Sequence, residues 1–193
     1  IAIISASPAI AGGFKLVLAG QSATVLKSDL KVTPSQDWNR LGSRIGRNAE
    51  SWTLDGLTLN DLTFYSGIPD NTTLFRAADK KNKPLPNFSK TMLVPDIAQL
   101  FESSYRIANE TSLMSIDKIE PASFAGQSGF RFTYSFTIQN EEVKRIGEAR
   151  GAIANGKLYM ITFEAPSIYY HERDIESFRK IADSAVIGRG SGK

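Results

Sequence analysis

The strongest constraint on the fold is the alternation of side chains over residues 130–138, which read FRFTYSFTI. The large apolar positions share one side of an extended chain: Phe130, Phe132, Tyr134, Phe136 and Ile138. Arginine, threonine and serine side chains occupy the other side. Because successive side chains of a strand point to opposite faces, this period of two predicts a strand with one buried face. Such burial is typical of an antiparallel sheet.

Two turn signals place further strands beside it. Asn155-Gly156 lies inside residues 145–165, RIGEARGAIANGKLYMITFEA, and Asn-Gly between β-rich runs is a strong hairpin signal. Asp55-Gly56 lies between two shorter runs, Glu50 to Leu54 and Asp61 to Ser66. We therefore expect two antiparallel strand pairs in addition to the strand at 130–138.

Two segments carry the spacing of amphipathic helices. Residues 94–111, VPDIAQLFESSYRIANET, begin with a proline suited to a first helical turn and keep apolar residues on one face. Residues from Asp174 to Val186 repeat that spacing, and we expect Asp174 to cap the second helix. Between the strands and the first helix, residues 70–90 are polar and rich in proline, which predicts a long surface loop.

Composition excludes several classes of protein. The chain has 193 residues, no cysteine and a single histidine, so disulfides, thiolate metal sites and histidine-rich zinc sites are excluded. Its net charge is +3, with 23 Lys and Arg against 20 Asp and Glu. Basic residues gather modestly only between Arg76 and Lys90, and we interpret them as a solvated loop rather than as a nucleic-acid surface.

The amino-terminal residues 1–23 do not show the period of a helix or of a strand. Leu18-Ala19-Gly20 resembles the start of a lipoprotein signal, but Gln21 stands where the lipid-bearing cysteine would be. We expect an export or anchor-like segment, or an irregular arm, that contributes little to the core. We expect a single domain over residues 24–187 and a flexible tail over residues 188–193.

The order of these elements resembles the PsbP-like fold. The resemblance rests on TPSQDW at 33–38, the helix at 94–111, the hairpin series from 129 to 166 and the final helix DIESFRKIADSA. It implies an α+β fold with a central antiparallel sheet flanked by helices, an αβα sandwich. The family includes many bacterial exported proteins of unknown role, and it offers no shared catalytic residues to carry over.

The one chemically suggestive run is SIYYHERD, residues 167–174. One interpretation makes His171 a general base or metal ligand beside Tyr169 and Tyr170. The other has the tyrosines cover the end of the sheet while His171 lies on the surface. Tyr169, Tyr170 and His171 are therefore the candidate binding residues, and no catalytic, cofactor-binding or metal-ligating residue is assigned.

The sequence favours a non-enzymatic domain of the bacterial envelope, periplasmic or lipoprotein-like, that binds a protein partner. We expect no cofactor and no nucleic acid, and membrane association only through a lipid anchor at the amino terminus. The alternative is an enzyme, dependent on a small molecule or a metal, with its site around Tyr169, Tyr170 and His171.

Overall fold

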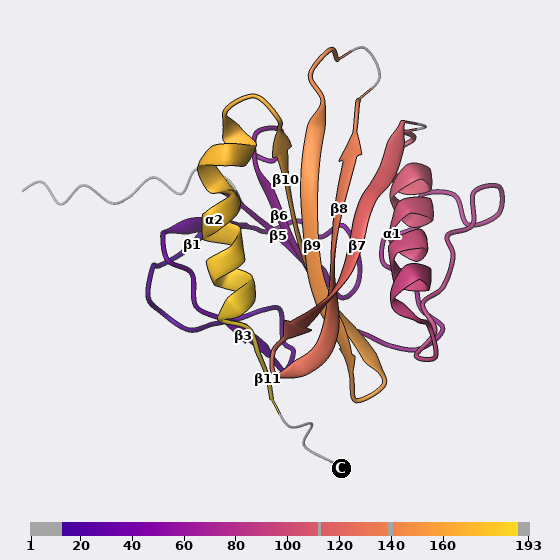
Figure 1. Ribbon diagram of the computed structural model, residues 1–193, viewed down its shortest axis with the longest axis horizontal. Coiled ribbons are helices and arrows are strands. Elements are labelled where there is room, and N and C mark those ends of the chain that lie inside the picture. The colour runs from indigo at the N-terminus through magenta and orange to yellow at the C-terminus, as the bar shows by residue number, and fades with distance from the viewer. Residues whose placement is uncertain (1–12, 112, 139–140, 189–193) are drawn as a thin grey trace, which may run out of the picture.

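A computed structural model describes residues 13–111, 113–138 and 141–188. Eight strands form an antiparallel sheet in the order β1-β4-β5-β6-β10-β9-β8-β7. Helices α1 and α2 lie on either side of this sheet, as Figure 1 shows. The expected α+β fold, a central antiparallel sheet flanked by helices, is confirmed.

The strands and helices of the described residues have the following bounds. The large sheet contains β1 (Phe14–Val17), β4 (Trp38–Leu41), β5 (Ala49–Thr53), β6 (Asp61–Ile68), β7 (Met114–Phe124), β8 (Gln127–Phe136), β9 (Arg145–Ala154) and β10 (Lys157–Pro166). A small sheet has the order β11-β3-β2 and contains β2 (Ala23–Thr24), β3 (Leu30–Val32) and β11 (Val186–Ile187). The helices are α1 (Val94–Ala108) and α2 (Tyr170–Asp183).

The alternating face of β8 forms the core beneath α1. Its four aromatic side chains from Phe130 to Phe136 are buried, and the Phe101 ring of α1 lies 5.0 Å from the Tyr134 ring and 5.5 Å from the Phe132 ring, centroid to centroid. Ile138 lies beyond the end of the strand and is exposed, contrary to the sequence pattern. The buried face therefore ends at Phe136.

A second core lies beneath α2 on the opposite face of the sheet. Phe178 of α2 stacks on Phe163 of β10 with ring centroids 5.8 Å apart, and Trp52 packs on Phe64 at 4.5 Å. Strands β6 and β10 are buried on both faces because they lie between the two cores.

The predicted hairpin at Asn155-Gly156 is confirmed. Both residues have positive φ, 52° and 70°, as the two-residue turn that favours Asn-Gly requires. β5 and β6 also pair antiparallel around Asp55-Gly56. Their connection, residues 54–60, is longer than a two-residue turn, and within it the buried Asn60 accepts hydrogen bonds from the backbone N–H groups of Leu54 and Asp55.

Three expectations about boundaries need correction. β1 pairs with β4, and its Val17 is buried in the core beneath α2, so the sheet begins before the boundary expected at Thr24. α2 begins at Tyr170, which places Asp174 inside the helix, where it is buried, rather than at its cap. At the other end the Gly188 N–H donates to the Asp29 carbonyl, and the rest of the expected tail, 189–193, lies outside the described residues.

The sequence pattern also missed β7, the edge strand beside β8. It contains a proline, three charged residues and a bulge between Ile116 and Lys118. These features are common in edge strands, where they discourage pairing with another molecule, and they obscure the period of two.

Gly147 in β9 supplies a test of the packing beneath α1. A β-carbon at this position would lie 2.1 Å from the Tyr134 ring, so the aromatic ring occupies the space of the missing side chain. We expect Gly147→Ala to lower the free energy of unfolding by about 1–3 kcal/mol, measured by urea denaturation, because the ring must move within a packed core. Gly188→Ala is the control, since its β-carbon would meet atoms only at 3.6 Å. Equal stability of the two variants would contradict this packing.

Candidate functional site

Tyr169 lies at the tight corner between β10 and α2 in an unusual backbone conformation. Its φ and ψ are 71° and −60°, and the Tyr170 N–H donates to the Ile168 carbonyl at 2.9 Å. These features define a γ-turn of the positive-φ kind, which is rare and strained. A non-glycine residue in such a region costs about 1–3 kcal/mol. Tyr169 also occupies the N-cap of α2 without making a side-chain cap hydrogen bond.

The turn presents a group of large side chains, which we call the Tyr169 patch: the exposed Ile168, Tyr169 and Arg173, and the half-buried Tyr170, which packs against the core beneath α2. Ile168 is 69% exposed and Tyr169 63% exposed. The two tyrosine rings meet edge to face at 5.2 Å, and the Arg173 guanidinium lies 5.5 Å from the Tyr169 ring centroid and 5.1 Å from that of Tyr170. The structure therefore brings Tyr169 and Tyr170 together and adds an arginine that the sequence pattern did not single out.

Arg173 holds the patch to the rest of the domain. Its guanidinium donates to both oxygens of the buried Asp174, at 2.7 Å each, and to Asp55 in the β5–β6 connection. These bonds raise the pKa of Arg173, and they lower the pKa of Asp55. The Asn60 amide also reaches Asp174 at 3.3 Å. Two chain segments thus fix one face of the patch.

His171 lies apart from the two tyrosines and points to the sheet. It is half-buried, with its ring 6.1 Å from that of Phe163. Its Nε2 atom is buried and has no hydrogen-bond partner within the described residues. Burial lowers the pKa of His171, which favours the neutral form of the ring.

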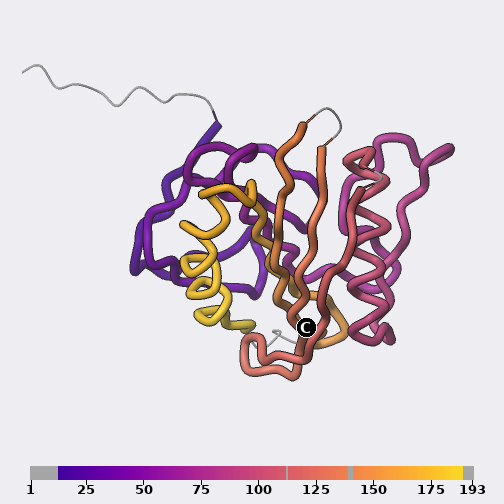
Figure 2. The backbone as a smooth tube through the Cα atoms, turned by 45° about the horizontal axis from the view of Figure 1, so that its top comes forward, coloured from indigo at the N-terminus to yellow at the C-terminus, as the bar shows by residue number. Residues whose placement is uncertain are grey.

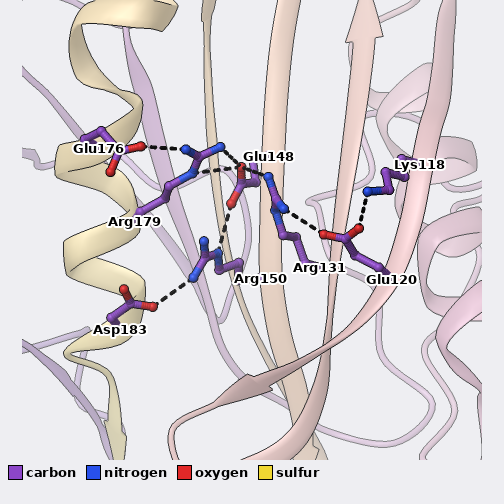
Figure 3. A network of polar contacts seen from close by, with 8 residues as sticks. All are labelled: Lys118, Glu120, Arg131, Glu148, Arg150, Glu176, Arg179 and Asp183. Atoms are coloured by element: carbon purple, nitrogen blue, oxygen red, sulfur yellow. Dashed lines mark hydrogen bonds and ion pairs between the residues drawn. The ribbon is translucent and has the colours of Figure 1, made fainter.

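A buried carboxylate, Glu148 of β9, organises the charged network drawn in Figure 3. Its negative charge partly opposes the effect of burial on the pKa of His171. Glu148 is 1% exposed and accepts hydrogen bonds from Arg131, Arg150 and Arg179, at 2.9 Å in the shortest contact of each. Burial by itself would raise the pKa of Glu148, but the three guanidinium groups outweigh it, and the pKa is lowered.

The network continues outward from these arginines to Lys118, Glu120, Glu176 and Asp183. Figure 3 shows that it runs from β7 across β8 and β9 to α2. Its positions fall on the polar side of the strands, which the alternation at 130–138 predicted, but the pairing of strands was needed to bring them together. The network fixes α2, and hence the Tyr169 patch, on the sheet.

A second group of carboxylates, which sequence reasoning missed, lies beneath α1. Asp61 and Glu164 are register partners on β6 and β10 and line a cavity of about 250 Å³. Glu164 accepts hydrogen bonds from the Tyr105 hydroxyl at 2.7 Å and from the Tyr134 hydroxyl at 2.9 Å. An adjoining cavity of about 420 Å³ shares Glu164 and Tyr105 and contains Arg145.

Both carboxyl groups hold protons more tightly than usual. Burial raises the pKa of Asp61 to about 6 and that of Glu164 to about 8, and the negative charge of Asp61 adds to the shift of Glu164. No signal in the sequence marked the pair, because Asp61 and Glu164 are far apart along the chain and only strand register places them side by side.

No group of three or more His, Asp or Glu side chains suited to a metal ion occurs within residues 13–111, 113–138 and 141–188. In the same part of the chain, no helix is long and apolar enough to cross a membrane.

Comparison with known proteins bears on the fold. No protein-family model and no curated protein matches the chain. The solution structure of cyanobacterial PsbP (CyanoP) from Synechocystis is similar over 96% of this chain and 98% of that chain, with 14% identity and a TM-score of 0.53. A crystal structure from Bacteroides thetaiotaomicron is similar over 91% of this chain, with 8% identity and a TM-score of 0.51, and the match spans 51% of that protein. The chain therefore has the PsbP-like fold that the sequence suggested.

The carboxyl pair predicts how stability depends on pH. Folding raises the pKa of Glu164, so the folded protein keeps a proton that the unfolded chain releases. The contribution of this group to folding stability is therefore full below the ordinary pKa of 4.5 and is lost as the pH rises through about 8. Because glutamine does not ionise, we expect the stability of Glu164→Gln relative to the native chain to rise by about 4 kcal/mol between pH 5 and pH 9. Urea denaturation at both pH values measures this. The exposed Glu172→Gln is the control, and a difference independent of pH would contradict the assignment.

The Glu148 network predicts that replacing this one carboxylate with an amide lowers the stability of the fold. Glu148→Gln removes the buried charge that the three half-buried guanidinium groups share. The arginines then keep only their more exposed partners, Glu120, Asp183 and Glu176. Because charge-assisted hydrogen bonds to a buried carboxylate are lost, we expect the free energy of unfolding to fall by about 2 kcal/mol. Glu176→Gln, at the exposed end of the same network, should cost less than about 1 kcal/mol. Thermal denaturation of both variants tests this, and equal losses would show that Glu148 does not organise the network.

Proposed function

We propose that this chain is a non-enzymatic domain of the bacterial cell envelope, periplasmic or lipoprotein-like, that binds a protein partner through the Tyr169 patch. The observation that carries the proposal is the strained γ-turn at Tyr169. A glycine there would relieve the strain, and a Ser, Thr, Asp or Asn would cap α2. A tyrosine at this position serves neither purpose, which is understandable if its exposed ring is needed for contact with another molecule.

The chemistry of the patch suits a protein surface. Tyrosine and arginine are enriched among the residues that contribute most to protein–protein binding. Tyr169 offers a large amphipathic ring, and the contacts of Arg173 with Asp55 and Asp174 fix the guanidinium before any partner arrives. This preorganisation reduces the entropy lost on binding.

The alternative, an enzyme with a site around Tyr169, Tyr170 and His171, gains less support from the geometry. A general base must reach the proton that it removes. The Nε2 atom of His171 is covered by protein, and its ring packs on Phe163 rather than beside the tyrosine rings. We therefore favour binding over catalysis for this region.

A location in the bacterial envelope is supported by the PsbP-like pattern of elements, since that family includes many bacterial exported proteins. The likeness of residues 18–20 to a lipoprotein signal gives no support, because Phe14–Val17 form a strand of the large sheet. Fractionation of cells that express the full-length protein from its own gene tests the location. Recovery in the periplasmic or outer-membrane fraction would support it, and recovery wholly in the cytosol would contradict it.

We expect replacement of Tyr169 by glycine to raise the stability of the fold and to weaken binding of the partner. Tyr169→Gly should relieve the positive-φ strain, whereas Tyr169→Ala should keep it, so the glycine variant should be more stable than the alanine variant by about 1 kcal/mol in urea denaturation. Both variants remove the ring and should lose the partner.

Photo-crosslinking in cells measures the binding. A crosslinking amino acid at position 168 should capture one discrete protein, and capture should fall at least severalfold when Tyr169 is also changed to glycine or alanine. The matched control is the same amino acid at position 93, since Leu93 is 71% exposed and lies before α1. Equal capture at both positions, or capture that survives both changes at Tyr169, would contradict the proposal.

A further inference from the structure

A basic groove lies between the β4–β5 connection, residues 42–48, and the first part of the long loop, residues 69–87. Its volume is about 830 Å³. Four cationic side chains line it, Arg44, Arg47, Arg76 and Lys80, and no acidic side chain does. Only Arg76 and Lys80 belong to the basic run of the sequence, and the fold adds the other two. The groove lies away from the Tyr169 patch in the chain and shares none of its residues.

These cations lack neutralising partners in the part of the chain that the structure describes. Within the described residues, none of the four forms an ion pair. The nearby acidic side chains have other partners. Asp70 accepts a hydrogen bond from the backbone N–H of Lys90 at 2.9 Å. Asp61 and Glu164 lie in a separate cavity that Arg76 also borders. Asp79 accepts hydrogen bonds from Asn82 and from the backbone of Lys81, and Glu110 pairs with Lys83 at 2.6 Å. The groove therefore concentrates positive charge that lacks an internal partner.

The walls of the groove are held in place by the core beneath α1. The long loop, which runs beside α1 in Figure 2, buries Leu74, Phe75, Leu85 and Phe88 in that core. Backbone hydrogen bonds of 2.8 Å join Arg76 to Ile45 and Phe88 to Thr72. The predicted surface loop at 70–90 thus has its basic side chains on the surface, as expected, but its four large apolar side chains are buried in the core. The four cationic side chains therefore extend from anchored backbone positions around one space.

We propose that this groove binds a small molecule that carries two or more phosphate groups. Arginine presents a planar set of donors that matches phosphate oxygens two at a time, and three of the four cations are arginines. The volume lies within the range of about 300–1,000 Å³ that small-molecule sites occupy. Several phosphates are required because a single one would leave most of the four positive charges unmatched.

Two sources could supply this chemistry, a soluble phosphorylated compound or the headgroup of a phospholipid. Isothermal titration calorimetry with inorganic tripolyphosphate at low salt tests the soluble form. Flotation with phosphatidylcholine vesicles, with and without cardiolipin, tests the lipid form, since cardiolipin carries two phosphates. Saturable binding to either probe that depends on the groove residues supports the proposal, and the probe that binds identifies the source.

The variants compare charges inside and outside the groove. Lys80→Gln removes a groove cation, whereas Lys81→Gln removes the next charge along the chain, which does not line the groove. We expect Lys80→Gln to weaken binding severalfold and Arg44→Gln with Arg47→Gln to weaken it about tenfold or more, with Lys81→Gln near the native affinity. All these side chains are exposed, so the thermal midpoint should not change.

Three results would overturn the proposal. The first is the absence of saturable binding to both probes at low salt. The second is equal weakening by Lys80→Gln and Lys81→Gln, which would show diffuse attraction to net charge. The third is groove-dependent binding of an acidic peptide such as hexaglutamate when neither phosphate probe binds, which would assign the groove to a protein segment.

Discussion

The burial of β6 and β10 on both faces determines how the rest of the domain is arranged. These two strands lie at the centre of an eight-stranded sheet, between an aromatic core beneath α1 and a second core beneath α2. Two helices of 15 and 14 residues are too narrow to cover such a sheet completely. The remaining surface is covered by loops, by a small second sheet and by paired charges, and the candidate sites lie in these parts.

Carboxyl groups are retained and compensated on both faces of the sheet. On the α2 side, Glu148 is held by three arginines, and the cost of burying it is offset by their guanidinium groups. On the α1 side, Asp61 and Glu164 face each other with fewer cations, and their charge is reduced by retained protons instead. The domain therefore compensates carboxyl groups inside the sheet in two ways, by pairing with arginines on one face and by retention of protons on the other.

The two surfaces proposed for binding differ in their physical basis. The Tyr169 patch depends on backbone strain and on an arginine fixed by two carboxylates, so its ligand should meet a rigid and partly apolar surface. The basic groove depends on cations without internal partners, so its ligand should be strongly anionic and its affinity should fall as salt increases. A domain with both features could hold a partner and a small anion at the same time.

The sequence by itself determined the parts of this protein whose physical signal is local. The alternation at 130–138, the Asn155-Gly156 turn and the periodicity of both helices each follow from a few neighbouring residues, and they predicted the α+β class correctly. Tertiary structure decided which distant side chains meet. Strand register places Asp61 beside Glu164, and loop packing brings Arg173 to Asp55 and Arg44 to the same groove as Lys80. Each of these pairs joins residues that are far apart along the chain, so no local pattern could have predicted it.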